Sequence, residues 1–287
     1  MTIRNPVEWS VDQFRHAALA FESAGRVGRR TLDTLHSPPP AVRRITTSDL
    51  REVLAAGLDD FAAFRTDVIF VCVFYPLVGL VLARLAFGYD MLPLVFPLAS
   101  GFALVGPLAA VGLNEMSRRR EAGLEAGWAD AIAVMRLPSF GSIVVLGLVL
   151  MGIFLLWLLA AKVIYELTLG PQPPASIASF IHDVFATGAG WTMILVGIGV
   201  GFLFALLVLA ISVVSFPLLL DREAGVDTAI LTSIRVVSTN PVPMAAWGLI
   251  IAGSLVLGSI PFFLGLIVVM PVLGHATWHL YRAVVER

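Results

Sequence analysis

Cysteine, charge and catalytic motifs are all scarce in this sequence. Cys72 is the single cysteine among 287 residues, so an intramolecular disulfide is excluded and a cysteine-based metal site lacks ligands. Only 14% of the residues are Asp, Glu, Lys or Arg, whereas soluble globular domains have about 25%. The sequence contains no Walker loop, nucleophile elbow, zinc motif or catalytic triad. We therefore expect a non-enzymatic protein without a resident cofactor.

Hydrophobic residues are correspondingly abundant, at 58%, and the mean hydropathy is +0.91. A membrane-spanning helix needs about 20 mostly apolar residues to cross about 30 Å of hydrocarbon. Six segments meet this requirement, so the sequence predicts an all-α polytopic membrane protein. The predicted spans cover residues 68–87, 92–113, 143–167, 191–220, 244–260 and 262–282.

The distribution of arginine predicts how these spans are oriented. Arginines concentrate in residues 1–65, in the second-to-third and fourth-to-fifth connections, and in the tail, whereas the opposite loops contain no Arg or Lys. Loops rich in Arg and Lys stay in the cytoplasm. We expect a multi-pass protein of the bacterial inner membrane with both termini in the cytoplasm. Nucleic-acid binding is not expected, because the basic residues lie beside membrane spans.

Two parts are predicted along the chain. Residues 1–45 form a polar cytoplasmic segment, with an amphipathic helix at 10–35 and a Pro-rich linker at 38–40. This segment lacks the short apolar core of a signal peptide. Residues 46–287 form a six-helix membrane domain, in which a short interfacial helix is expected at 176–185.

An internal repeat organises the membrane domain. The tetrapeptide Arg-Glu-Ala-Gly at 120–123 recurs at 222–225, and each copy leads into a proline and an apolar span. A weaker third copy begins near Ser48. The repeat predicts three units, each consisting of an amphipathic cytoplasmic helix followed by a two-helix hairpin.

The first of these amphipathic helices has a clear pattern. Ser48 can cap a helix whose first turn contains Asp49 and Glu52. Apolar residues then recur at helical spacing, which predicts a helix that lies in the interface or packs under the membrane domain. This predicted apolar stripe consists of Leu50, Leu54, Leu58, Phe61 and Phe64.

His275 and His279 are the most suggestive candidate pair. Their i, i+4 spacing places both imidazoles on one face of the sixth predicted span. They could form part of an interfacial anchor, take a proton-active or polar-gating role, or bind a metal or haem. A metal would need further ligands that the other spans do not offer.

Other candidate residues lie at span ends and on helix faces. Glu115 and Asp221 each precede an arginine cluster and could pair with it, or could line a substrate-binding acidic ring. Gly197 and Gly201 form a small-xxx-small face on the fourth span. That face could serve packing within the chain or homo-oligomer formation.

Several blocks of the sequence carry a family resemblance. Residues 49–65, 106–120, 216–222 and 274–282 resemble a family of predicted bacterial integral membrane proteins with a domain of unknown function, DUF2189. The resemblance covers about residues 40–285, with Asn114 standing where the family typically has an aromatic residue. The repeat is also distantly similar to glycerophosphodiester phosphodiesterase-type membrane domains, which lack catalysis of their own. Both resemblances imply a membrane domain, and the second also implies that this domain has no catalytic activity.

Three functions are compatible with these features. The first is a scaffold, assembly or lipid-associated module, with the lipid bilayer and a membrane protein or a second copy as partners. The second is a small-solute transporter or channel, because the spans contain proline and glycine. The third is a haem- or metal-handling protein that uses His275 and His279.

Overall fold

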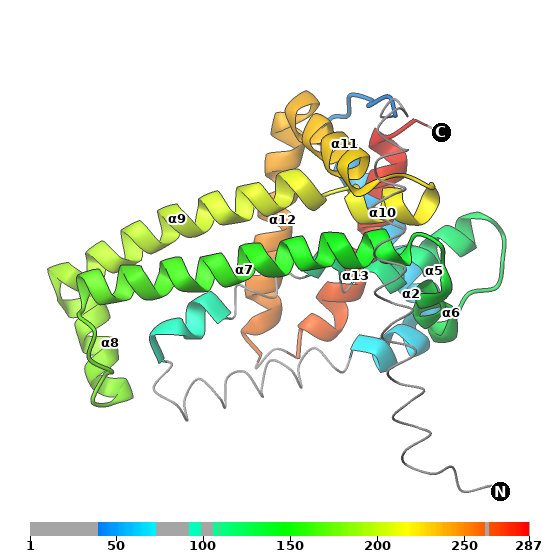
Figure 1. Cartoon of the computed structure of the whole chain (residues 1–287). Helices are drawn as coiled ribbons and strands as arrows, with labels where there is room; N and C mark the ends of the chain where they lie inside the picture. The colour runs from blue at the N-terminus through cyan, green and yellow to red at the C-terminus, as the bar shows by residue number, and fades with distance from the viewer. Residues whose placement is uncertain (1–39, 73–91, 99–105, 109, 262–263, 287) are drawn as a thin grey trace, which may run out of the picture.

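The computed structural model describes residues 40–72, 92–98, 106–108, 110–261 and 264–286 (Figure 1). Regular structure in these ranges is helical, apart from an isolated antiparallel bridge between Val42 and Val285. The predicted all-α class is confirmed over them. The elements are α2 (Asp49–Cys72), η1 (Leu92–Leu94), α5 (Val111–Glu121), α6 (Trp128–Ala133), η2 (Val134–Arg136), α7 (Phe140–Thr168), α8 (Ile177–Ala186), α9 (Gly188–Ser212), α10 (Ser215–Asp221), α11 (Val226–Thr239), α12 (Pro241–Ser259) and α13 (Leu266–Val284).

Three candidate membrane spans are present in the described ranges. They are α7, the stretch Gly188–Asp221 that contains α9 and α10, and α12, each long and apolar enough to cross a bilayer. They coincide with the predicted spans at 143–167, 191–220 and 244–260. The protein is thus an integral membrane protein with candidate transmembrane helices.

The long Gly188–Asp221 stretch is broken between α9 and α10, at Val213 and Val214. Pro217 explains the position of the break. A proline ring collides with the carbonyl group four residues earlier, here that of Val213, and supplies no N–H. Ser212 and Ser215 then bond back to the carbonyls of Val208 and Ile211, at 2.7 and 2.6 Å.

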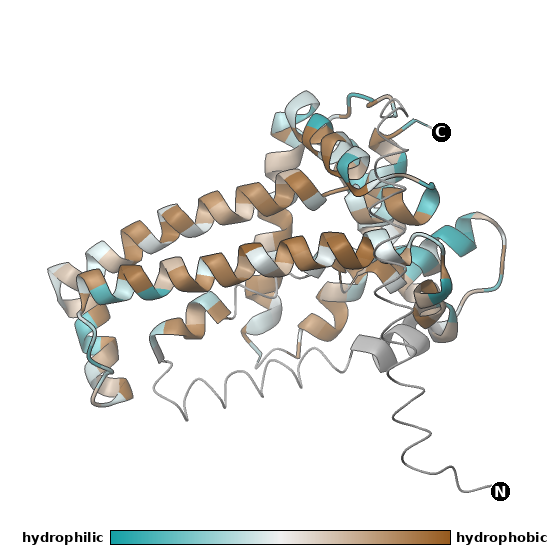
Figure 2. Ribbon diagram, in the orientation of Figure 1, coloured by the Kyte–Doolittle hydropathy of each residue, from teal (hydrophilic) through white to brown (hydrophobic). Residues whose placement is uncertain are grey.

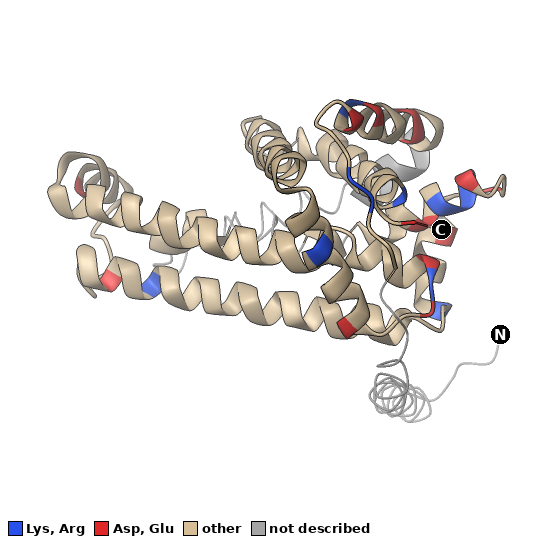
Figure 3. Ribbon diagram, turned by 90° about the horizontal axis from the view of Figure 1, so that it is seen from above, with Lys and Arg blue, Asp and Glu red and all other residues tan. Residues whose placement is uncertain are grey.

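Helices α7 and α9 lie side by side as a long hairpin that projects from the other helices, with α8 at its tip (Figure 1). The ribbon of this hairpin is mostly hydrophobic (Figure 2). Helix α9 contains no charged residue, and α7 has only Lys162 and Glu166, an exposed pair 3.6 Å apart near the tip. Most charged residues gather at the end away from α8 (Figure 3). We call this region the charged end.

The short helix expected near 176–185 is confirmed as α8. Ser176 precedes it, and its Oγ accepts a hydrogen bond from the N–H of Ser179 at 3.0 Å. This is the N-cap arrangement that satisfies an otherwise unpaired N–H of the first turn. The predicted interfacial position of this helix remains a prediction.

Three of the six predicted spans are not confirmed. The first is described only as far as Cys72, at the end of α2, and the second only in part. The sixth is present as helix α13 but is not a candidate span, because His275, His279 and Arg282 make its second half too polar. The predicted amphipathic helix at 10–35 lies outside the described residues, as does the predicted linker at 38–40 except for Pro40.

The six-span arrangement and the repeat therefore stay predictions. The two matching tetrapeptides also differ in conformation, since Gly123 is left-handed at φ 71° and Gly225 has φ −72°. Helix α6 after the first copy has 6 residues, and α11 after the second has 14. Figure 1 shows α12 running across the α7–α9 hairpin, so a single bundle of spans is not confirmed either.

The charged end is built on the packing of α2 against α13. The two helices run antiparallel: the N–H of Arg43, just before α2, donates to the carbonyl of Val284, at the end of α13, at 2.8 Å. Gly57 permits the closest approach, because a Cβ at this position would lie 2.7 Å from the Cβ of Ala276. Helix α5 packs alongside α13 and completes a three-helix group.

Candidate functional site

A buried carboxylate lies at the centre of this three-helix group. Asp60 on α2 is 4% exposed. It accepts hydrogen bonds from Ser117 Oγ at 2.5 Å and from His279 Nε2 at 2.8 Å, and it forms an ion pair with Arg120. Ser117 in turn contacts Nδ1 of His275 at 2.8 Å. We call these five residues the Asp60 cluster.

Helical spacing explains how the cluster assembles. Ser117 and Arg120 lie three residues apart on α5, and His275 and His279 lie four apart on α13, so each pair occupies one helix face. Asp60 follows Gly57 by three residues on α2 and therefore lies on the face that packs closely against α13. The close approach brings this short side chain within reach of both neighbouring helices.

The positions of the protons follow from the partners. Asp60 is a carboxylate and can only accept, so the single Ser117 proton goes to Asp60. The Ser117 oxygen must then accept from His275, which places an N–H on Nδ1. Nε2 of His275 is consequently a bare lone pair, and it has no partner among the described residues although His275 is fully buried.

Asp60 is held in its ionised form. Burial alone raises the pKa of a carboxyl group, but hydrogen bonds from His279, Ser117 and Arg120 outweigh burial and lower the pKa of Asp60 to about 2. Near neutral pH the charges of Asp60 and Arg120 therefore balance. The cluster is a hydrogen-bonded tie between α2, α5 and α13.

The geometry does not favour hydrolytic or metal chemistry in the cluster. A nucleophilic serine gives its proton to a histidine base, whereas Ser117 donates to Asp60. Ser117 and His275 are also inaccessible, at 1% and 0% exposure. The described residues contain no group of three or more His, Cys, Asp or Glu arranged to hold a metal ion.

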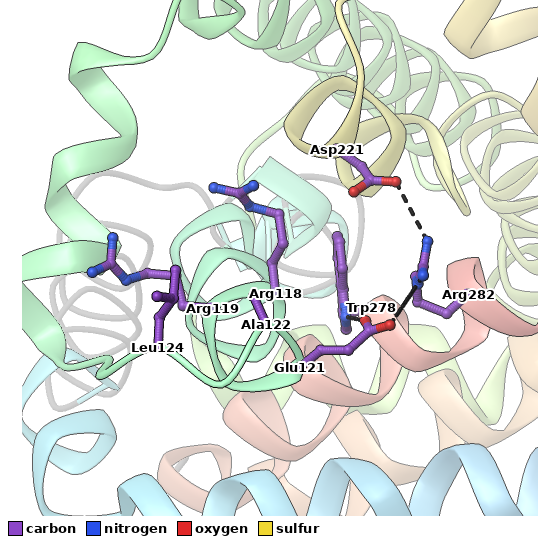
Figure 4. Close-up of a pocket in the computed structure, with 8 residues that line it drawn as sticks. All are labelled: Arg118, Arg119, Glu121, Ala122, Leu124, Asp221, Trp278 and Arg282. Atoms are coloured by element: carbon purple, nitrogen blue, oxygen red, sulfur yellow. Dashed lines mark hydrogen bonds and ion pairs between the residues drawn. The ribbon is translucent and has the colours of Figure 1, made fainter. Parts of the chain in front are cut away.

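A second polar network borders the cluster at the charged end (Figure 4). Arg282 lies between the carboxylates of Glu121 and Asp221, at 3.0 and 3.5 Å. Glu121 accepts from Trp278 Nε1 at 2.9 Å, and Asp221 accepts from the Tyr281 hydroxyl at 2.7 Å. The network ties α5 and α10 to α13. It lines an open cleft of about 350 Å³ together with Arg118, Arg119, Ala122 and Leu124.

The predicted acidic residues lie in different surroundings. Glu115 is 4% exposed and accepts two hydrogen bonds from Arg118, at 2.7 and 2.8 Å, which raise the pKa of Arg118. Asp221 pairs with Arg282 of α13 rather than with its sequence neighbour Arg222. Arg222 instead donates to the carbonyl of Glu286. Asp221 also raises the pKa of Arg118, so the two acids share this arginine as an electrostatic neighbour, and the acidic ring stays a prediction.

The two candidate packing glycines, Gly197 and Gly201, have different surroundings. A Cβ at Gly201 would lie 3.1 Å from the Trp157 ring of α7, so Gly201 contributes to packing inside the hairpin. Gly197 has nothing within 4 Å of its Cβ position.

Sequence reasoning identified His275 and His279 but missed Asp60, Ser117 and Arg120 as their partners. In the predicted apolar stripe of α2, Leu50 is buried, Leu58 is 51% exposed, and the other three residues pack against buried side chains. The buried face also includes Val53 and Asp60, which the prediction did not contain. One signal was available. Val53, Gly57 and Asp60 follow Leu50 at helical spacing, and a glycine on that face marks a close helix contact.

Comparison with known proteins found a match for the middle of the chain. Residues 95–221 match the family model described as predicted integral membrane protein, DUF2189. This range includes Ser117 and Arg120 but not Asp60 or the two histidines. No curated protein and no solved structure matches the chain, so the distant similarity to glycerophosphodiester phosphodiesterase-type membrane domains stays a prediction. Over residues 95–221 the expected resemblance is confirmed, and this part of the chain is similar to the DUF2189 family of predicted integral membrane proteins.

Proposed function

We propose that this protein is a non-enzymatic scaffold of the bacterial inner membrane that holds lipids or partner membrane proteins on its apolar helices. In this proposal the chain is multi-pass and both termini are cytoplasmic, because the arginines concentrate in the connections on one side of the predicted spans. The charged end then lies at the cytoplasmic surface, and α8 lies at the opposite surface.

The outward apolar surface of the α7–α9 hairpin is the observation that carries the proposal. Only 11% of the most apolar stretch of Gly188–Asp221 is buried within the chain. Exposed apolar patches of this extent mark a membrane or a protein interface. Large side chains that face outward on the two helices include Leu148, Leu155, Leu159, Leu195, Ile198 and Phe202.

The charged end supports a structural rather than a substrate-binding role. Arg118, Arg120 and Arg282 each pair with a carboxylate of the same chain. The Arg120 and Arg282 pairs join neighbouring helices, and the Arg118 pair lies within α5. Charges neutralised in this way leave little net charge for a ligand. The scaffold would therefore contact its partners through shape and apolar area along the hairpin.

No specific observation favours a transporter or channel, or a haem- or metal-handling protein. The described cleft lies at the charged end and is open, whereas a transporter binds its solute near the middle of the bilayer. His275 and His279 contact Ser117 and Asp60 rather than converging on a common point.

Native mass spectrometry tests the proposal. The protein is purified from its own membranes in a mild detergent, exchanged into a second detergent, and weighed. We expect species that carry a defined number of lipids or a partner chain through the exchange. A monodisperse chain with neither would contradict the proposal. Protein-dependent solute flux into proteoliposomes would contradict it as well and would favour the transporter.

A further inference from the structure

His275 has an unusual combination of burial and incomplete bonding. Its side chain is fully buried, its Nδ1 is bonded to Ser117, and its Nε2 is the one buried polar atom of the Asp60 cluster without a partner among the described residues. Buried polar atoms are almost always paired, so an exception calls for an explanation. An imidazole nitrogen with a free lone pair can take up a proton.

The surroundings of His275 would not accommodate that proton. The charged and titratable groups facing it are Asp60 on α2, Arg120 on α5 and His279 on its own helix. Asp60 already accepts from three donors, and its charge is balanced by Arg120. The ring of Phe64 lies 6.0 Å from the imidazole, centroid to centroid. The ring has one favourable backbone contact, with the carbonyl of Leu113, but Nε2 has no partner among the described residues. A second N–H on Nε2 would therefore be a buried positive charge with no acceptor of its own in the part of the chain that the structure describes.

We propose that the Asp60 cluster is a proton-responsive lock, in which proton uptake at Nε2 of His275 separates α13 from α2 and α5. An unpaired buried charge strongly disfavours the closed packing, and separation gives the new N–H access to water. A histidine open to water, as His275 is after separation of the helices, changes its charge close to physiological pH. The lock is closed when His275 is neutral and opens on acidification. This inference does not depend on the scaffold proposal.

The second histidine acts in the opposite direction. His279 is partly exposed, and its Nε2 already points at Asp60, so a charged His279 strengthens its contact with that carboxylate. Opening is thus specific to His275. Because Trp278 and Arg282 belong to the same helix, separation of α13 also alters the cleft at the charged end.

Hydrogen exchange of the full chain in lipid nanodiscs between pH 8 and pH 5 tests the lock. After correction for the intrinsic pH dependence of exchange, we expect amides of 53–60 and 273–281 to lose protection at low pH. One proton linked to opening changes the opening equilibrium by up to about tenfold per pH unit. In His275→Asn the side-chain N–H can replace the Nδ1 donor to Ser117, but nothing titrates, so we expect no pH response.

Three further observations complete the test. His182→Asn, on the exposed surface of α8, should respond like the wild type. Unchanged wild-type protection across the pH range, or a full response in His275→Asn, would overturn the lock. If the amides of His275→Asn are unprotected at both pH values, the variant has lost the helix packing and cannot test the lock. The ¹⁵N chemical shifts of the wild-type His275 imidazole then show whether Nε2 is protonated when the helices open. Protonation of Nε2 together with opening supports the lock, and a ring that stays neutral while the amides open refutes it.

Discussion

Asp60 organises the charged end because one carboxylate accepts from three side chains on two other helices. Asp60, the Ser117–Arg120 pair and His279 are far apart in the chain, so only the tertiary fold brings them together. The sequence offered the spacing of the histidines, which is local, but not the identity of their partners. For the same reason, the sequence indicated the neighbouring Arg222 as a partner of Asp221, whereas the partner in the structure is Arg282.

Replacement of Asp60 by Asn should destabilise the fold while keeping the shape of the side chain. The substitution removes the charge that Arg120 and His279 face, and a lost hydrogen bond to a charged group costs about 1.5–3 kcal/mol. Partial exposure of Arg120 favours the lower end of this range. Thermal unfolding in detergent measures the effect. Asp59→Asn, on the exposed neighbour, should be close to neutral, and equal effects of the two variants would contradict the role of Asp60.

The ionisation of Asp60 also predicts an acid limit for stability. Its pKa is about 2 in the fold, against 3.8 for an ordinary aspartate. A carboxyl group with a lowered pKa stabilises the fold fully above the unfolded value and loses this contribution as the pH falls through the folded value. We expect unfolding free energy to fall between about pH 4 and pH 2 in the wild type, and a shallower fall in Asp60→Asn. Identical slopes would contradict this.

At the scale of helices, long apolar runs were predictable and helix contacts were not. The spans at 143–167, 191–220 and 244–260 were predicted because a single property, continuous apolar length, defines them. The apolar stripe of α2 was predictable from its spacing, but the sequence left open whether this stripe lies in the membrane interface or packs under the membrane domain. In the structure the close contact of Gly57 with α13 and the partners of Asp60 decide which face is buried.

Gly57→Ala should weaken the packing of α2 against α13. The new methyl group would lie 2.7 Å from the Cβ and 2.8 Å from the backbone N of Ala276, and backbone cannot move aside cheaply. Overpacking of this kind costs about 1–3 kcal/mol. Gly253→Ala on α12 is the matched control, since nothing lies within 4 Å of its Cβ position. Thermal unfolding compares the two, and a neutral Gly57→Ala would argue against the helix contact.

The hairpin glycines give a second test at this scale. Gly201→Val should disturb the hairpin, because the Trp157 ring leaves no room, whereas Gly197→Val should be tolerated in a monomer. Fluorescence of Trp157 in a variant without the other tryptophans reports the hairpin contact. A Gly197→Val variant that changes the oligomeric state without changing this fluorescence would instead indicate that Gly197 serves contacts between chains.

At the scale of the whole molecule, the protein combines an apolar hairpin whose outer surface is mostly exposed with a charged end whose groups pair with each other (Figures 2 and 3). The first surface is suited to lipid and apolar helices. The second fixes α2, α5, α10 and α13 relative to one another. The proposed scaffold function rests on this difference between the apolar hairpin and the charged end.

Site-specific photocrosslinking in native membranes tests this account most directly. A photoreactive residue at Ile198, which is 60% exposed on α9, should form adducts with a discrete partner protein or with lipid of defined class. The same residue at Leu146, buried on α7, is the matched control and should crosslink only within the chain. Adducts specific to Ile198 would support a scaffold that acts through its apolar hairpin. The absence of any intermolecular adduct at Ile198, or equal adducts at both positions, would contradict it.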